Sequence, residues 1–184
     1  MNIGKGIGGH SRAYRGRSDV WLTPPALLSM LGAFDLDPCA APEPRPWATA
    51  AEMWNSDGLE RPWRGRVFLN PPYGPQTGLW LKRLADHGNG VALIFARTET
   101  DMFVRQVWRR ADAILFVYGR LHFHRPDGER APCNSGAPSV LIAYGADNVE
   151  ALRTSGIDGA FISSWKTSQR NSERCVVDDE ELPL

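Results

Sequence analysis

The sequence predicts one α/β domain with three layers, in which helices cover both faces of a mostly parallel sheet. Segments of strand character alternate with segments of helical character along the chain, as in α/β folds. The run 91–95 is apolar at every position, which indicates a strand covered on both faces. A length of 184 residues fits a single domain, and 42% hydrophobic residues are enough for a packed core.

The first half of the chain predicts two helices and two strands. A helix follows Thr23 and Pro24, because Thr is a good N-cap and Pro a good first helical residue. Its apolar stripe consists of Leu27, Leu28 and Leu31. Short strands are expected at 34–37 and 66–70, and a short helix at 47–54. Four prolines between positions 38 and 46 exclude regular structure there.

In the second half of the chain, predicted helices and strands alternate more regularly. This half predicts helices at 76–87, 101–110 and 147–153, and strands at 91–95, 113–117 and 139–144. The segment 120–125 alternates and favours a further strand, and 126–138 predicts a loop rich in Pro, Gly and Asn.

Composition divides the chain into three parts. Residues 1–18 are rich in Gly, Arg and Ser and predict a flexible basic arm. Residues 19–164 form the folded domain, and residues 165–184 a polar, acidic C-terminal tail.

Charge and cysteine content indicate the kind of partner and the cellular compartment. Basic and acidic residues balance at 21 each, but Arg outnumbers Lys by 18 to 3. Arg suits phosphate recognition, although GC-rich coding produces the same bias. Three scattered cysteines (Cys39, Cys133 and Cys175), with neither a signal peptide nor a membrane span, predict a cytoplasmic protein with free thiols.

The sharpest motif is Asn70-Pro71-Pro72-Tyr73, directly after the apolar segment 67–69. In open α/β sheets, ligands bind at the carboxyl ends of strands. The Asn70 side-chain oxygen and the Pro71 carbonyl could accept the two N–H groups of an amine and expose its lone pair to a methyl sulfonium. Tyr73 could stack on a planar substrate. The alternative is a proline turn whose Asn caps the next helix.

The chain shares an ordered series of sequence segments, including this motif, with a known family. The chain resembles the phage-encoded DNA N6-adenine methyltransferases, a Dam-like family, in the segments 19–24, 36–40, 56–59, 68–74, 96–100, 118–123 and 138–140, and at Trp80 and Lys82. The resemblance implies an abbreviated, Rossmann-like S-adenosylmethionine-dependent methyltransferase fold over residues 19–164. It also implies a bacterial host cell, with the gene carried by a phage or prophage, and double-stranded DNA as the partner.

The resemblance assigns roles to individual residues. The implied catalytic residues are Asn70, Pro71, Pro72 and Tyr73. Those implied to bind S-adenosylmethionine are Trp21, Thr23, Pro24, Asp37, Cys39, Ala40, Asp57 and Asn70. Asp37 would accept from the ammonium or the ribose hydroxyls, or else only form the turn before Pro38. Asp57 would contact the adenosine part, or else lie in a solvated turn.

The substrate adenine would have to be flipped out of the duplex. Candidates for phosphate contacts are Arg12, Arg15 and Arg17 in the basic arm, and Arg120, Arg125 and Arg130 near the loop 126–138; a solvated loop is the alternative for each. His122, His124 and Cys133 lack a fourth ligand, so no metal is expected.

Two departures from the usual methyltransferase pattern leave alternatives open. The usual glycine-rich loop is replaced by 37–40, and only 33 residues separate Asp37 from Asn70, which predicts shortened or missing strands between them. The alternatives are a related enzyme that methylates RNA or protein glutamine, and a decayed homologue that only binds DNA.

Overall fold

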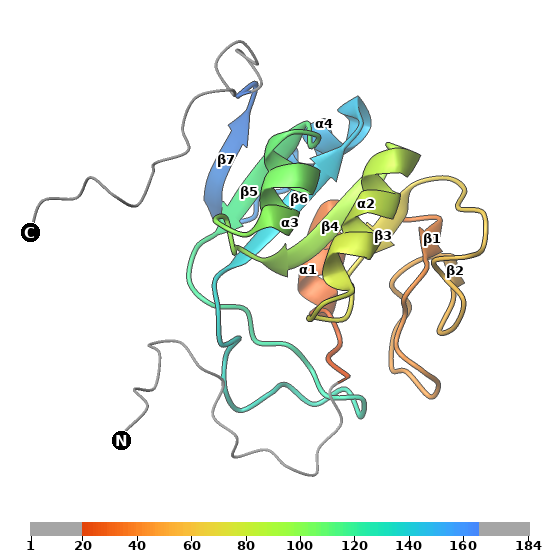
Figure 1. Cartoon of the computed structure of the whole chain (residues 1–184). Coiled ribbons are helices and arrows are strands. Elements are labelled where there is room, and N and C mark those ends of the chain that lie inside the picture. The colour runs from red at the N-terminus through yellow and green to blue at the C-terminus, as the bar shows by residue number, and fades with distance from the viewer. Residues whose placement is uncertain (1–19, 166–184) are drawn as a thin grey trace, which may run out of the picture.

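The structure, a computed structural model, describes residues 20–165 and contains a seven-stranded sheet (Figure 1). The strands lie in the order β2 (Glu52–Met53), β1 (Leu36–Asp37), β3 (Val67–Leu69), β4 (Gly90–Phe95), β6 (Ser139–Tyr144), β5 (Ala113–Val117) and β7 (Gly159–Ser163). The α/β class expected from the sequence is confirmed.

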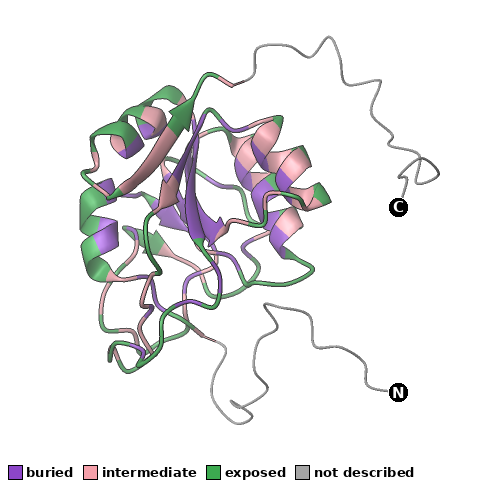
Figure 2. Cartoon of the chain, turned by 90° about the vertical axis from the view of Figure 1, so that its left-hand side faces the viewer, coloured by how far each residue is buried: buried purple, intermediate pink, exposed green. Residues whose placement is uncertain are grey.

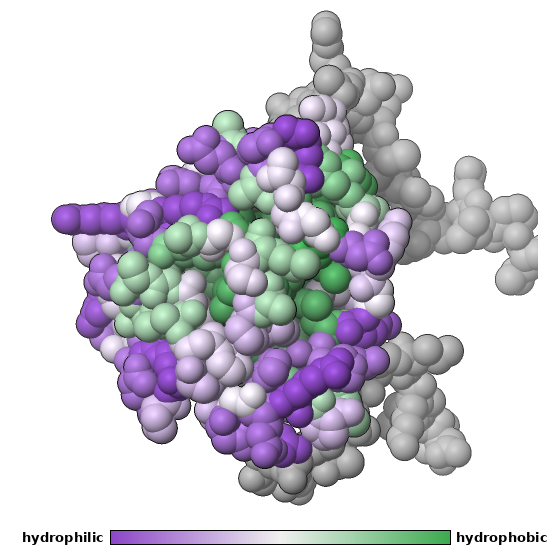
Figure 3. Space-filling view, turned by 180° about the vertical axis from the view of Figure 1, so that it is seen from behind, coloured by the Kyte–Doolittle hydropathy of each residue, from purple (hydrophilic) through white to green (hydrophobic). Residues whose placement is uncertain are grey.

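Helices cover both faces of the sheet (Figure 2). One face carries α1 (Pro25–Leu31) and α4 (Ala146–Thr154). The other carries α2 (Thr77–His87), α3 (Asp101–Phe103) and a short π-helical segment, η2 (Val104–Trp108). Seen from the α1 and α4 side, apolar residues gather in the middle of the surface, with hydrophilic residues around them (Figure 3).

The central strand β4 contributes to two separate cores. Ala92 and Ile94 pack in the cluster that includes Leu81 of α2, whereas Val91 and Leu93 pack in the cluster that includes Leu28 of α1. Because successive side chains of a strand point to opposite faces, an entirely apolar strand needs cover on both sides. This confirms the interpretation of the run 91–95.

The sheet is mixed rather than mostly parallel. The ladders β1–β2, β1–β3 and β3–β4 are parallel. However, β6 is antiparallel to both β4 and β5, and β7 is antiparallel to β5. The expectation of parallel strands failed here because β6 follows the long segment 118–138 and re-enters the sheet in the opposite direction, between β4 and β5.

Three local predictions were wrong. The segment 47–54 contains β2 instead of a helix. The segment 120–125 forms no strand, only isolated bridges at His124. Thr23 does not cap α1: among the described residues the helix has no side-chain cap, and the Pro24 carbonyl accepts from the backbone of Leu27 and Leu28.

The chain order reverses between β1 and β3. The chain runs from β1 outward to β2 and then returns to the other side of β1 as β3. Such a reversal opens a crevice at the carboxyl ends of the two strands, where α/β sheets bind ligands. The predicted site residues Asp37 and Asn70 lie at these two strand ends.

Candidate active site

A cavity of about 500 Å³ lies at this crevice. Its walls come from the segments 20–23, 37–42, 55–58 and 70–73, with additional side chains from Arg45, Trp47, Thr49 and Trp80. The volume lies within the range of small-molecule and cofactor sites. The sequence-predicted residues Trp21, Thr23, Asp37, Cys39, Ala40, Asp57, Asn70, Pro71, Pro72 and Tyr73 all line it, whereas Pro24 does not.

The turn after β3 is fixed by the first residue of α2. The Thr77 hydroxyl donates to the Pro72 carbonyl (2.8 Å) and accepts from the Gly74 amide (3.0 Å). Two consecutive prolines further limit the conformations of this turn. The Asn-Pro-Pro-Tyr segment is therefore held in place by contacts within the protein alone.

The Asn70 amide is oriented by two neighbours. Its Nδ2 donates to Thr23 Oγ1 (3.1 Å), and its Oδ1 accepts from the Tyr73 hydroxyl (3.2 Å). The Asn70 side chain does not cap α2, so the helix-cap alternative was wrong. Within residues 20–165, no hydrogen bond ends on the Pro71 carbonyl oxygen, which leaves it as an acceptor.

Two aromatic rings stack beside this turn. Tyr73 lies on Phe95, at the end of β4, with ring centroids 4.1 Å apart and an angle of 11° between the planes. The Tyr73 residue is nonetheless 37% exposed and lines the cavity, so part of its side chain is accessible to a ligand. Burial raises the pKa of the Tyr73 hydroxyl well above its ordinary value, which keeps the group protonated as a donor to Asn70.

Asp37 is a buried carboxylate at the floor of the cavity, 3% exposed. One oxygen accepts from the Cys39 backbone amide (3.1 Å) and forms the expected turn, which does not test the cofactor role of Asp37, and the other accepts from the Thr49 hydroxyl. Burial raises the pKa of Asp37 to about 6, against the opposing effects of these hydrogen bonds and of the Arg45 charge. Asp37 is therefore mostly ionised at neutral pH.

Asp57 lines the cavity from a tight turn. It has a positive φ of 57°, and its carbonyl accepts from the backbone of Glu60 and Arg61. A Cβ on the neighbouring Gly58 would lie 1.8 Å from the Pro38 carbonyl oxygen, so only glycine fits there. The segments 55–58 and 37–42 are thus in direct contact along the cavity wall.

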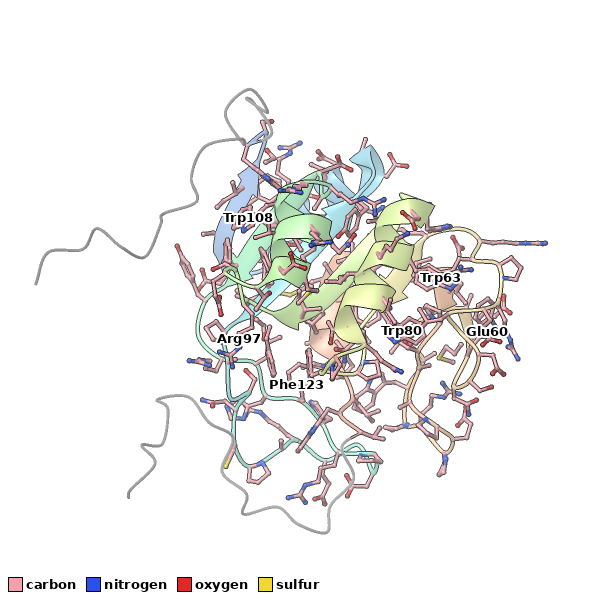
Figure 4. The ribbon with its side chains drawn as sticks, in the orientation of Figure 1. Glu60, Trp63, Trp80, Arg97, Trp108 and Phe123 are labelled. Atoms are coloured by element: carbon pink, nitrogen blue, oxygen red, sulfur yellow. The ribbon has the colours of Figure 1, made fainter. Side chains whose placement is uncertain are left out.

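Trp80 and Trp63 support the same wall. Their rings stack with centroids 6.3 Å apart, and both lie beside the β1 end of the sheet (Figure 4). The Trp63 indole donates to the Gly58 carbonyl (2.6 Å). These contacts hold the Gly58 turn against the cavity.

The loop region 118–138 adjoins the rim of the cavity. Leu22, a lining residue, exchanges backbone hydrogen bonds with His124 (2.8 and 3.0 Å). The Trp47 indole donates to the Thr23 carbonyl (3.1 Å), and its ring meets His124 edge-on. Phe123 is buried in the core, which anchors the loop (Figure 4).

Of the predicted DNA-binding arginines, the three within the described residues, Arg120, Arg125 and Arg130, do not line the cavity. Arg120 and Arg130 are exposed, and Arg125 is half-buried with its guanidinium 3.6 Å from Glu129. Arg12, Arg15 and Arg17 fall outside the described residues.

His122 and His124 bond to the carbonyls of Ala131 and Gly128, respectively.

Sequence reasoning missed several residues of the site. Thr49 and Arg45 come from the proline-rich segment, which has no periodicity to indicate which side chains point inward. Thr77 and Phe95 were placed in a helix and a strand without a role at the site. A hydroxyl four residues after Tyr73, and an aromatic residue at a strand end, were signals that could have been used.

Neither a metal site nor a membrane span is found in the described part of the chain. No group of three His, Cys, Asp or Glu side chains within residues 20–165 could hold a metal ion. In that range, each helix is too short or too polar to cross a bilayer.

Comparison with known proteins identifies the family. The family model described as DNA N-6-adenine-methyltransferase (Dam) matches residues 10–154, a range that includes every residue lining the cavity. Searches of curated proteins and of solved structures found no match. With the greater part of its length matched, the chain belongs to the DNA N-6-adenine-methyltransferase (Dam) family.

Proposed function

We propose that this protein transfers a methyl group from S-adenosylmethionine to the N6 amine of an adenine that has been flipped out of double-stranded DNA. The observation that carries the proposal is the position of the Asn70-Pro71 acceptors, which lie in the wall of a cavity at the reversal point of the sheet. The cavity is the cofactor site in this proposal, and its mouth receives the base.

The residues of the cavity fit the cofactor. Asp37 and Asp57 offer carboxylates to ammonium or hydroxyl groups, and Trp21 and Trp80 offer apolar ring surface. The Trp80 indole N–H is buried without a partner among the described residues, which leaves a donor for a ligand atom. When bound, S-adenosylmethionine supplies an electrophilic methyl group on a sulfonium.

Asn70 and Pro71 act on the amine. The exocyclic amine of adenine is a poor nucleophile, because its lone pair is delocalised into the ring. Asn70 Oδ1 has a second lone pair besides the one used by Tyr73, and the Pro71 carbonyl oxygen is also available. Two acceptors on the two N–H groups favour a tetrahedral nitrogen, whose lone pair would then be free to attack a methyl group.

Thr23 and Tyr73 position these groups. Thr23 accepts from Asn70 Nδ2, which directs the amide oxygen rather than its nitrogen toward the amine. The ring of Tyr73 can stack on the flipped base with the face that Phe95 does not occupy. Stacking of about 1–3 kcal/mol offsets part of the few kcal/mol that flipping costs.

The transfer balances as a simple displacement. With S-adenosylmethionine bound, the bond from its sulfur to the methyl carbon would break as the bond from N6 to that carbon formed, leaving S-adenosylhomocysteine and releasing one N–H proton. The amide oxygen of Asn70 is too weak a base to keep that proton, so water takes it up. The rate therefore comes mainly from in-line positioning, worth up to roughly 7–11 kcal/mol in well-oriented reactions.

Methyl transfer from labelled S-adenosylmethionine tests the proposal. Purified protein should label double-stranded DNA, and hydrolysed product should contain N6-methyladenine. Label in RNA or protein but not in DNA would contradict the proposal and support the related amino methyltransferases. Failure to label any of the three, despite cofactor binding in calorimetry, would also contradict it.

A further inference from the structure

Arg45 is a buried cation with unused hydrogen-bonding capacity. It lies in the proline-rich segment at the cavity wall, and its side chain is only 10% exposed. Its Nε donates to Glu43 Oε1 (2.7 Å), and its backbone N–H donates to Glu43 Oε2 (3.0 Å). Nη1 is buried without a partner among the described residues. A buried, charged donor without an acceptor is costly, which indicates that a ligand completes the site.

The surroundings of Arg45 specify the ligand. Asp37 lines the same cavity, but it bonds to Thr49 and Cys39, while Arg45 bonds to Glu43. The cavity wall thus carries one carboxylate and one guanidinium that do not neutralise each other through a hydrogen bond. The α-amino acid group carries the complementary pair, an ammonium and a carboxylate.

We propose that Arg45 binds the carboxylate of the methionyl end of the methyl donor, while Asp37 receives its ammonium. This inference rests on the proposed function and deepens it. The planar fork of an arginine matches a carboxylate with two parallel hydrogen bonds. Nη1 is closed off from solvent, so binding requires the fork to turn toward the cavity, which the long side chain permits.

A DNA phosphate is a poorer match for Arg45. The side chain is nine-tenths buried, whereas Glu43, its partner, is exposed and places a negative charge on the outer side. A phosphate that approached from outside would meet Glu43 first. Arg45 lines the cavity, and neither terminal nitrogen of its guanidinium has a hydrogen-bond partner among the described residues.

Isothermal titration calorimetry on the full chain tests this with two probes. S-adenosylhomocysteine contains the amino acid end, and 5′-methylthioadenosine lacks it. Arg45→Met keeps the apolar stem but removes the fork. It should weaken S-adenosylhomocysteine binding by about 10- to 100-fold, the size of a hydrogen bond to a charged group, and leave 5′-methylthioadenosine binding within about twofold. Arg45→Lys should lose less, because it keeps the charge.

Each other outcome has a defined meaning. Equal weakening of both probes, or of neither, would overturn the role of Arg45 and leave the proposed function intact. A loss of DNA binding with unchanged affinity for both probes would overturn it in favour of a phosphate contact. If wild-type protein binds neither probe, the proposed function itself fails. Glu43→Gln is the matched control, expected to change both affinities by less than about threefold, as for an exposed ion pair.

Discussion

The two halves of the sheet differ in length, direction and contents. β4, β6 and β5 have five or six residues each, pair in antiparallel ladders, and are almost completely buried. β2, β1 and β3 have two or three residues each, run parallel, and end at polar loops. The long half supplies most of the core, whereas the short half supplies the cavity walls. The loops that follow the three short strands line the cavity.

The short half is held by contacts of a different kind. Hydrogen bonds from side chains join Thr23 to Asn70 and Thr49 to Asp37 between separate segments, and a further one joins Trp63 to Gly58 within one loop. The long half is held by backbone ladders and apolar packing. Changes in the long half should therefore lower stability, and changes in the short half should lower activity.

The largest effect on stability is expected from Leu141→Ala. Leu141 lies in β6 and is fully buried, so the change leaves a cavity in the core. We expect the free energy of unfolding to fall by about 2–5 kcal/mol in urea titrations. Methyl transfer per folded molecule should stay near wild type at low temperature. A folded Leu141→Ala protein without activity would break the division between the halves.

Thr23→Val should produce the opposite result. Thr23 is buried, and valine has nearly the same shape but cannot accept from Asn70 Nδ2. We expect kcat to fall by about 10- to 100-fold, because one orienting hydrogen bond is lost and the amide can rotate. Thr23→Ser should restore most of the rate. If valine and serine have the same effect, Thr23 contributes packing rather than orientation.

The pH dependence of cofactor affinity should reveal the ionisation of Asp37. With a pKa of about 6, its ionised fraction falls about tenfold between pH 7 and pH 5, so affinity for S-adenosylhomocysteine should weaken about tenfold over that range. Asp37→Asn should bind weakly throughout, without this dependence.

Stability should change in the other direction over the same pH range. The folded-state pKa of Asp37 lies above its unfolded value of 3.8, so the folded state binds the proton more tightly. The stabilisation this provides is complete below the unfolded value and is lost as pH rises through 6. Relative to Asp37→Asn, wild-type protein should therefore become less stable between pH 4 and pH 7. If the free energy of unfolding depends on pH in the same way in wild type and Asp37→Asn, the raised pKa of Asp37 is contradicted.

The smallest effects are expected at the exposed arginines. Arg120→Ala and Arg130→Ala should each weaken DNA binding a few-fold and reduce the slope of log affinity against log salt by about one. Arg153→Ala is the matched control, because Arg153 is exposed on α4, outside the loop region 118–138, and pairs with Glu150. Equal effects of the three changes in fluorescence anisotropy would argue against a specific DNA-facing loop.

The fold could be predicted where patterns are local. β3, β4, β5 and β6 are continuous apolar runs, so their burial follows from composition alone. β2 has only two residues, which is too short to show a periodicity. β7 is only half-buried, so it lacks the continuous apolar run that predicts a strand.

The site could be predicted in part for the same reason. Asn70 to Tyr73 are adjacent in sequence, so their grouping was a local feature. Thr23 was expected both to bind the cofactor and to cap a helix, and the capping part was wrong because its side chain bonds to Asn70, 47 residues away. Arg45 and Thr49 depend on the path of an irregular loop, which the sequence does not specify.

The central claim is that the Asn70 side-chain oxygen binds the amine of the substrate. Methyl transfer by the Asn70→Ala and Asn70→Asp variants tests it most directly. With labelled cofactor and DNA, we expect Asn70→Ala to lose about 100- to 1000-fold in kcat while S-adenosylhomocysteine affinity stays within threefold. Asn70→Asp, which retains an acceptor oxygen, should keep measurable activity. Near wild-type turnover by Asn70→Ala would contradict the account.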